Sequence, residues 1–164
     1  MGVDSEKLML VLDELGIVTT TVEHPPLRTI EDSRRLRGNL KGAHVKNLFL
    51  KDKKGGYWLL AALEHTLIDL RATAALLQAP RFSFANAEEL DRILGIAPGA
   101  VSPFAAINDT DGRVCVVLEQ RVLEADLLNC HPLRNDRTTT IATSDLLRFL
   151  KAVGHPPRTI PLPG

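Results

Sequence analysis

The spacing of apolar residues predicts five helices. Near the N-terminus, apolar side chains recur at helical spacing from Leu8 to Leu15; Asp4 or Ser5 can cap this helix, and Gly16 ends it. The other helical patterns cover residues 29–36, a basic stretch that opens like a capping box, and residues 69–78, 87–94 and 143–153.

Alternating and β-branched segments predict strands between these helices. They cover residues 18–23, 44–51, 57–63, 81–85, 114–118 and 138–142. Residues 52–56, which end in two glycines, join the second and third strands as a hairpin. Part of the sheet is therefore antiparallel.

Two further segments are expected to be irregular. Residues 96–110 contain prolines, a glycine and Asn108-Asp109 at positions typical of turns. The Pro-rich end, residues 156–164, is expected to lie over the surface without regular structure. The predicted fold is a mixed α/β (α+β) fold in which helices flank a largely antiparallel central sheet, and residues 1–164 form a single domain.

Composition narrows the class of protein. The 164 residues are 45% hydrophobic and 24% charged, which is typical of a soluble globular chain. No apolar run approaches the roughly 20 residues that cross a bilayer, and the acidic N-terminus lacks the build of a secretory signal. The two cysteines, Cys115 and Cys130, have no metal-type spacing. We therefore expect a cytoplasmic protein without a membrane partner.

Charge is balanced overall but uneven along the chain. Twenty basic residues match twenty acidic ones, which argues against strong non-specific binding to nucleic acid. Residues 28–54, however, hold nine basic and three acidic side chains (+6), and the rest of the chain holds 11 and 17 (−6). Either a solvated charged face or a patch for a polyanion accounts for this excess. In the second case, the RNA-binding candidates are Arg34, Arg35, Arg37 and Lys41.

The common catalytic motifs are absent from the sequence. The histidines are widely spread, and no HxH, HExxH or CxxC pattern occurs. There is no G-x-S-x-G elbow, P-loop or G-x-G-x-x-G. Cys130 and His131 are strand neighbours that point to opposite faces, so they form no ready nucleophile–base pair. We expect neither a metal nor a cofactor.

Two features remain as candidate chemistry. Strand alternation places Lys46 on the face of Leu48 and Leu50, where an ammonium group is costly unless it snorkels to water or meets a negative or carbonyl group. The loop 99–103 is either plain turn structure or, if it faces a pocket, a cradle of backbone N–H groups for an anion or a carbonyl oxygen.

Three segments resemble a known family. They are residues 44–59, which include K-N-L-F-L-K-D-K-K-G, residues 94–109, which include P-G-A-V-S-P-F, and residues 129–135, which include H-P-L. Together they resemble the freestanding editing deacylases of the prolyl-tRNA synthetase editing-domain superfamily (the YbaK/ProX superfamily). The resemblance runs through nearly the whole chain. The lysine motif is most similar to the branch that clears alanine from mischarged proline tRNA.

The resemblance implies metal-independent hydrolysis of an aminoacyl ester on a mixed α/β fold. It assigns Lys46 as the essential lysine and His131 as a pocket residue that limits amino-acid size. Asn47 lies beside the lysine within the motif. The G-x-x-x-P loop supplies Gly99, Ala100, Val101 and Ser102 to catalysis and Pro103 to substrate binding.

These expectations lead to one function and its alternatives. The protein is expected to deacylate alanyl-tRNA(Pro), with Lys46 and loop N–H groups stabilising the oxyanion and the substrate's own ribose hydroxyl assisting the water. Its partners are then mischarged tRNA(Pro) and, as a second partner, prolyl-tRNA synthetase, but not DNA. The alternatives are a deacylase for seryl or cysteinyl esters and a non-catalytic RNA-binding module. Only seven aromatic residues are available for base stacking in such a module.

Overall fold

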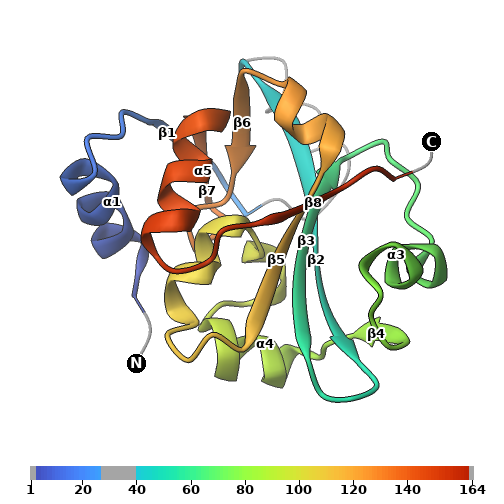
Figure 1. The fold of residues 1–164 in the computed structure, drawn as a ribbon. Coiled ribbons are helices and arrows are strands. Elements are labelled where there is room, and N and C mark those ends of the chain that lie inside the picture. Colours follow the sequence, from blue (N-terminus) through green and yellow to red (C-terminus); the bar gives the residue numbers. More distant parts are fainter. Residues whose placement is uncertain (1–2, 27–39, 163–164) are drawn as a thin grey trace.

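An eight-stranded sheet runs through the molecule (Figure 1). The computed structural model describes residues 3–26 and 40–162. The strands lie in the order β1-β7-β6-β2-β3-β5-β8, and β4 also pairs with β2. Their bounds are β1 (Thr20–Glu23), β2 (Ala43–Asp52), β3 (Tyr57–Leu63), β4 (Phe82–Phe84), β5 (Val114–Glu119), β6 (Leu127–Cys130), β7 (Arg137–Ala142) and β8 (Arg158–Ile160).

The strand pairings confirm the predicted α+β class. Four pairings are antiparallel, and three are parallel. Parallel neighbours need a crossover connection, and β3 reaches β5 through α3 (Leu70–Leu77), β4 and α4 (Ala87–Leu94). The sheet is therefore mixed, with a modest antiparallel majority.

The helices in the described ranges form where the periodicity predicts them, and side chains cap three of the four. In α1 (Ser5–Glu14), the Asp4 carboxylate accepts from the Lys7 N–H at 2.9 Å. Asp69 caps α3, and Asn86 forms a capping box with Glu89 at the start of α4. The fourth is α5 (Thr143–Ala152), which follows β7 directly. Every helix within the described ranges is too short or too polar to cross a lipid bilayer.

Two hydrophobic clusters cover the sheet. The first contains buried residues of α1, α4 and α5 together with β5, β6 and β7, and its largest buried rings are Phe104 and Phe149. The second packs α3 against β2, β3 and the C-terminal segment. In Figure 1, α1 and α5 lie on one side of the molecule and α3 on the other. Strand β2 contributes to both clusters through its alternating side chains.

The structure corrects the prediction for the Pro-rich end. Residues 158–160 form β8, which pairs in parallel with β5, and Ile160 and Leu162 are buried. Proline lacks an N–H group, but Arg158, Thr159 and Ile160 retain theirs, so the segment between prolines can extend a sheet edge.

Several smaller boundaries also differ from the prediction. Residues 96–110 contain two 3-10 helices, η1 (Pro98–Ala100) and η2 (Pro103–Asn108), each of which begins at a proline. Strand β1 begins at Thr20, and Val18 is exposed. Strand β6 covers Leu127–Cys130, so the strand expected at Cys130 and His131 ends at Cys130, and His131 lies in the irregular segment that follows. The predicted basic helix at 29–36 lies outside the described residues.

Candidate functional site

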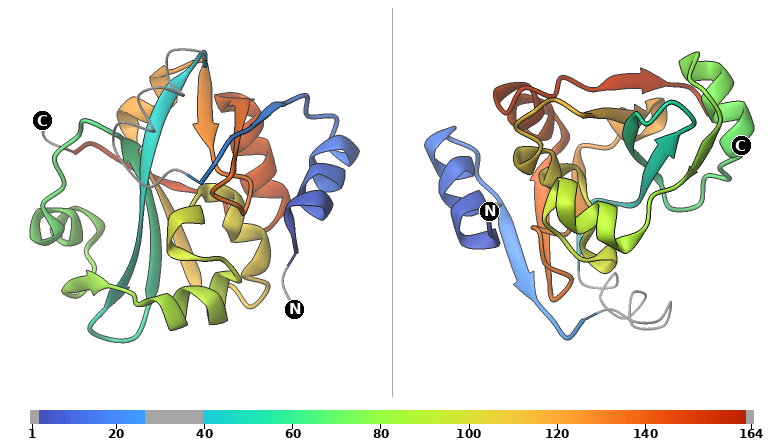
Figure 2. Two further views of the ribbon diagram at one scale, coloured as in Figure 1. Left: turned by 180° about the vertical axis from the view of Figure 1, so that it is seen from behind. Right: turned by 90° about the horizontal axis from the view of Figure 1, so that it is seen from below.

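Polar side chains gather on one face of the sheet where β6, β7 and β1 meet. Leu128, Cys130 and Ile141 belong to the first cluster, so the alternating neighbours Asn129 and Thr140 point to the opposite face. The Thr140 hydroxyl donates to Asn129 Oδ1 at 2.6 Å, and Asn129 Nδ2 donates to the Lys41 carbonyl at 2.9 Å. Figure 2 (left) views the molecule from the side opposite to Figure 1, so that this face is turned toward the reader and α5 lies on the far side of β6 and β7.

Lys46 enters the same face from β2. Alternation places it with Leu48 and Leu50, as predicted, while Val45 and Phe49 pack into the first cluster. The lysine is half-buried, and its ammonium group donates to the Thr66 carbonyl. Of the two arrangements open to a lysine on this strand face, the structure shows the one in which the ammonium meets a carbonyl oxygen.

His131 follows the last residue of β6, the strand that neighbours β2 in the sheet. Strands β2 and β6 run parallel, with Ala43 opposite Leu128 and His44 opposite Asn129. The strands separate here, because β6 ends at Cys130. The predicted lysine lies on β2, and the predicted pocket histidine follows the strand beside it.

The hydrogen bonds of His131 fix its tautomer. Its Nδ1 lies 2.9 Å from the Arg137 carbonyl oxygen, which can only accept, so Nδ1 carries the proton in the neutral ring. Burial lowers the pKa of His131 and the nearby His24 lowers it further, although the bond to the Arg137 carbonyl acts in the other direction. The ring is accordingly neutral near pH 7, and Nε2 has no hydrogen-bond partner among the described residues.

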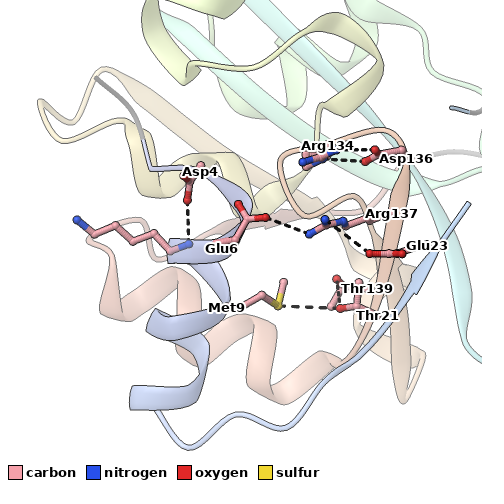
Figure 3. A network of polar contacts seen from close by, with 10 residues as sticks. Asp4, Glu6, Met9, Thr21, Glu23, Arg134, Asp136, Arg137 and Thr139 are labelled. Atoms are coloured by element: carbon pink, nitrogen blue, oxygen red, sulfur yellow. Dashed lines mark hydrogen bonds and ion pairs between the residues drawn. The ribbon is translucent and has the colours of Figure 1, made fainter. Parts of the chain in front are cut away.

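Arg137 is itself held in place by ion pairs. Its guanidinium contacts Glu6 of α1 at 3.4 Å and Glu23 of β1 at 3.6 Å, and Arg134 pairs with Asp136 at 2.6 Å in the preceding turn (Figure 3). The carbonyl that orients His131 therefore belongs to a residue tied to two other elements.

The predicted loop 99–103 contacts the backbone of His131. The Ser102 hydroxyl donates to the His131 carbonyl at 2.6 Å, and Ser102 is completely buried. A Cβ on Gly99 would lie 3.1 Å from Asn135 Nδ2, which explains why a glycine suits this position. The N–H groups of Val101 and Ser102 make no hydrogen bond within the described part of the chain. Ser102 is buried, so of these two residues only Val101 is partly exposed.

Asn47 faces away from Lys46, toward the first cluster. Its Oδ1 is buried and lacks a hydrogen-bond partner among the described residues. Ala100 and Val101 of the loop pack in that same cluster. The structure therefore places Lys46 on one face of β2, and Asn47 and the loop on the other.

The edge of β2 between these two faces is interrupted. Strand β6 pairs with β2 at Ala43 and His44, and β4 pairs with it from Leu50 to Asp52. Residues 45–49 have no described strand along that edge. A ligand that crosses this gap would meet groups from both faces.

Comparison with known proteins identifies the family. The profile of the aminoacyl-tRNA editing domain matches residues 24–149, which include Lys46, the loop and His131. The chain belongs to the aminoacyl-tRNA editing domain family. It is 34% identical over 164 residues to the prolyl-tRNA editing protein ProX of Acetoanaerobium sticklandii, covering 99% of this chain and 100% of that protein.

Other comparisons give the same family and fold. The chain is 38% identical over 151 residues to the bovine (Bos taurus) prolyl-tRNA synthetase associated domain-containing protein 1, covering 89% of this chain and 88% of that protein. The crystal structure of a candidate trans-editing enzyme for prolyl-tRNA synthetase superposes with a TM-score of 0.75 at 20% identity, covering 98% of this chain and 96% of that one. At that identity the structural match supports the fold alone.

Of the remaining predicted site residues, one lies within the described ranges and three lie outside them. Lys41 is exposed, and its backbone lies beside Asn129, whereas Arg34, Arg35 and Arg37 lie outside the described residues. Within the described ranges, no group of three or more His, Cys, Asp or Glu side chains is arranged to hold a metal ion.

Some polar residues of this face are not among the sequence predictions. His24 Nε2 lies 2.9 Å from the Thr138 hydroxyl, and the His24 ring lies 6.3 Å from that of His131. The signal in the sequence is the run of three threonines at 138–140 in a strand, since at least one of them must face the side opposite Ile141.

Proposed function

We propose that this protein is a trans-editing deacylase that hydrolyses alanyl-tRNA(Pro), releasing alanine and free tRNA. The main support is the gap in the β2 edge: Lys46 belongs to β2 at this gap, and Ser102 of the Gly99–Pro103 loop bonds to His131, which follows β6. Membership of the editing-domain family and the prolyl-tRNA editing described for ProX support the same reaction.

The proposed chemistry needs little from the protein beyond positioning and charge. An aminoacyl ester is already activated, so the main requirement is to stabilise the oxyanion that forms when water attacks the carbonyl carbon. We assign the stabilising donors to loop N–H groups on one face of β2 and to the Lys46 ammonium on the other face. A terminal ribose that crosses the gap would lie between these donors.

The attacking water is oriented by the substrate in this proposal. We assign no general base to the protein, and His131 Nδ1 is committed to the Arg137 carbonyl. The free ribose hydroxyl beside the ester assists the water instead. No metal ion takes part, and we expect the rate to be unchanged in a chelator.

Selectivity for alanine is assigned to the size and polarity of the pocket. His131 forms a wall that admits a methyl group and excludes the pyrrolidine ring of proline. A pocket rejects a larger side chain by steric clash, whereas a missing methylene loses only about 1–3 kcal/mol. The buried, unpartnered Oδ1 of Asn47 accepts a hydrogen bond from the bound substrate or its water.

A panel of charged tRNA(Pro) molecules tests this function. We expect rapid release of alanine under single-turnover conditions, slower release of serine and cysteine, and an ester of proline that remains intact. Arg134→Ala, which removes an exposed ion pair, serves as a folded control with the same preference. Protection of the alanyl ester would instead identify an RNA-binding module that uses the basic residues 28–54.

A further inference from the structure

A buried carboxylate lies at the end of β5, behind Lys46. Glu119 is completely buried. Its Oε1 accepts from the Leu63 N–H at 2.9 Å and from the Thr66 hydroxyl at 2.7 Å, and its Oε2 accepts from Arg121 Nε at 2.6 Å. Arg121 also donates to the Thr66 hydroxyl at 3.0 Å. These bonds direct the carboxylate to the turn after β3 and to Arg121.

The bonds to Glu119 join both ends of one tight turn. Leu63 is the last residue of β3, and the Thr66 N–H donates back to the Leu63 carbonyl at 3.0 Å. The carboxylate therefore crosslinks the first and last residues of this turn through Oε1. Burial raises the pKa of Glu119, but the bonds from Thr66, Leu63 and Arg121 together hold it below its ordinary value. The group is ionised at neutral pH.

The carbonyl of this turn is the acceptor for Lys46. Thr66 is almost completely buried, and its carbonyl oxygen accepts from Lys46 Nζ. An ammonium group has three N–H donors. The Thr66 carbonyl takes one of them, and the other two have no acceptor among the described residues. The direction of those two donors depends on where the carbonyl is held.

We propose that Glu119 and Thr66 are positioning residues for Lys46: the carboxylate fixes the turn, and the turn aims the lysine at the substrate. A buried ion pair is a weak source of stability, because well-packed apolar groups often replace it without loss. A role in orienting Lys46 explains why a full charge is retained there. The inference rests on the proposed function, in which Lys46 contacts the substrate.

Two substitutions at Thr66 test the inference without removing the buried charge. Thr66→Val keeps the shape and the carbonyl but loses the hydroxyl that binds Glu119, whereas Thr66→Ser keeps the hydroxyl. We expect Thr66→Val to lower the single-turnover rate about tenfold or more, because small misplacements of a catalytic group are costly. Its dissociation constant for tRNA stays at the wild-type value, and Thr66→Ser restores the rate.

A second pair of variants separates positioning from general stability. Glu119→Gln is expected to lower the rate in the same way. Glu89→Gln alters another buried carboxylate, which contacts Tyr57 and Lys51 and makes no contact with Lys46; it is expected to reduce thermal stability and leave the rate unchanged.

The outcomes distinguish this inference from the proposed function. A wild-type rate in folded Thr66→Val, or equal losses in Thr66→Val and Thr66→Ser, would overturn the positioning role while Lys46→Ala remained inactive. A fully active Lys46→Ala would overturn the proposed function itself.

Discussion

Single residues at this site owe their properties to backbone groups of neighbouring elements. Burial lowers the pKa of His131 and keeps its ring neutral, whereas the hydrogen bond to the Arg137 carbonyl fixes the tautomer with the proton on Nδ1 and by itself raises the pKa. In the proposed function this ring is a wall that selects the ester by shape. Its removal should change which ester is excluded more than how fast an accepted ester reacts.

His131→Ala tests this directly. We predict a folded protein that loses activity on alanyl-tRNA(Pro) and gains relative activity on prolyl-tRNA(Pro). The loss follows because alanine then sits loosely, and a shift of about 1 Å can cost on the order of 100-fold. The measurement is the ratio of the two single-turnover rates in mutant and wild type. Glu88→Ala, an exposed side chain on α4, is the control. An unchanged ratio would move selectivity to the loop or to the tRNA.

The elements themselves are largely predictable because helical periodicity and capping residues are local signals. Helices α1, α3, α4 and α5 and the β2–β3 hairpin follow from such signals, as does the face of β2 on which Lys46 lies. Strand β8 escapes prediction because prolines flank it, and its pairing with β5 joins segments about 40 residues apart. The Glu119–Thr66 contact is likewise invisible in the sequence, since only the folded sheet brings those residues together.

The contacts of Glu89 on helix α4 lead to a prediction about how acid weakens the link between α4 and the β2–β3 hairpin. Glu89 in its first turn accepts from the Tyr57 hydroxyl, the Asn86 N–H and Lys51, and these contacts lower its pKa from 4.5 to about 2 although burial opposes them. A carboxylate with a lowered folded-state pKa stabilises the protein above its unfolded-state pKa, and the contribution is lost as the pH falls through the folded value.

We therefore expect the free energy of unfolding to decrease between pH 4.5 and about 2, and to decrease less steeply in Glu89→Gln. Urea unfolding at several pH values measures both slopes. Glu88→Gln, exposed in the same turn, should keep the wild-type slope. Equal slopes in wild type and Glu89→Gln would show that this contact does not link α4 to β3 in the acid range.

The net charge of the whole molecule is zero because one basic segment is balanced by an acidic remainder. The chain is neutral overall, but residues 28–54 carry +6, and Lys41 and Lys46 of that segment lie at the polar face and the β2 gap. A tRNA would bind at this basic region, because the rest of the chain is acidic overall and does not attract phosphates. Binding should therefore be local and sensitive to salt.

Charge reversal tests this arrangement. We predict that Arg35→Glu weakens tRNA binding, lowers the slope of log Kd against log salt by about one for each phosphate that is no longer neutralised, and leaves the single-turnover rate at saturation unchanged. Arg148→Glu on α5, exposed and paired only with Asp145 and the Leu15 carbonyl among the described residues, is the control. Binding that does not respond to salt would exclude residues 28–54 as the tRNA contact.

Catalysis by Lys46 is tested most directly by the single-turnover rate of Lys46→Ala on alanyl-tRNA(Pro), with Lys151→Ala on the exposed side of α5 as the matched control. If Lys46 stabilises charge in the transition state, its removal should lower the rate by about 100- to 1000-fold, with the far-ultraviolet circular dichroism and tRNA affinity retained. Lys151→Ala should match wild type. A folded Lys46→Ala protein that hydrolyses the ester at a rate within a few-fold of wild type would contradict a catalytic role for this lysine.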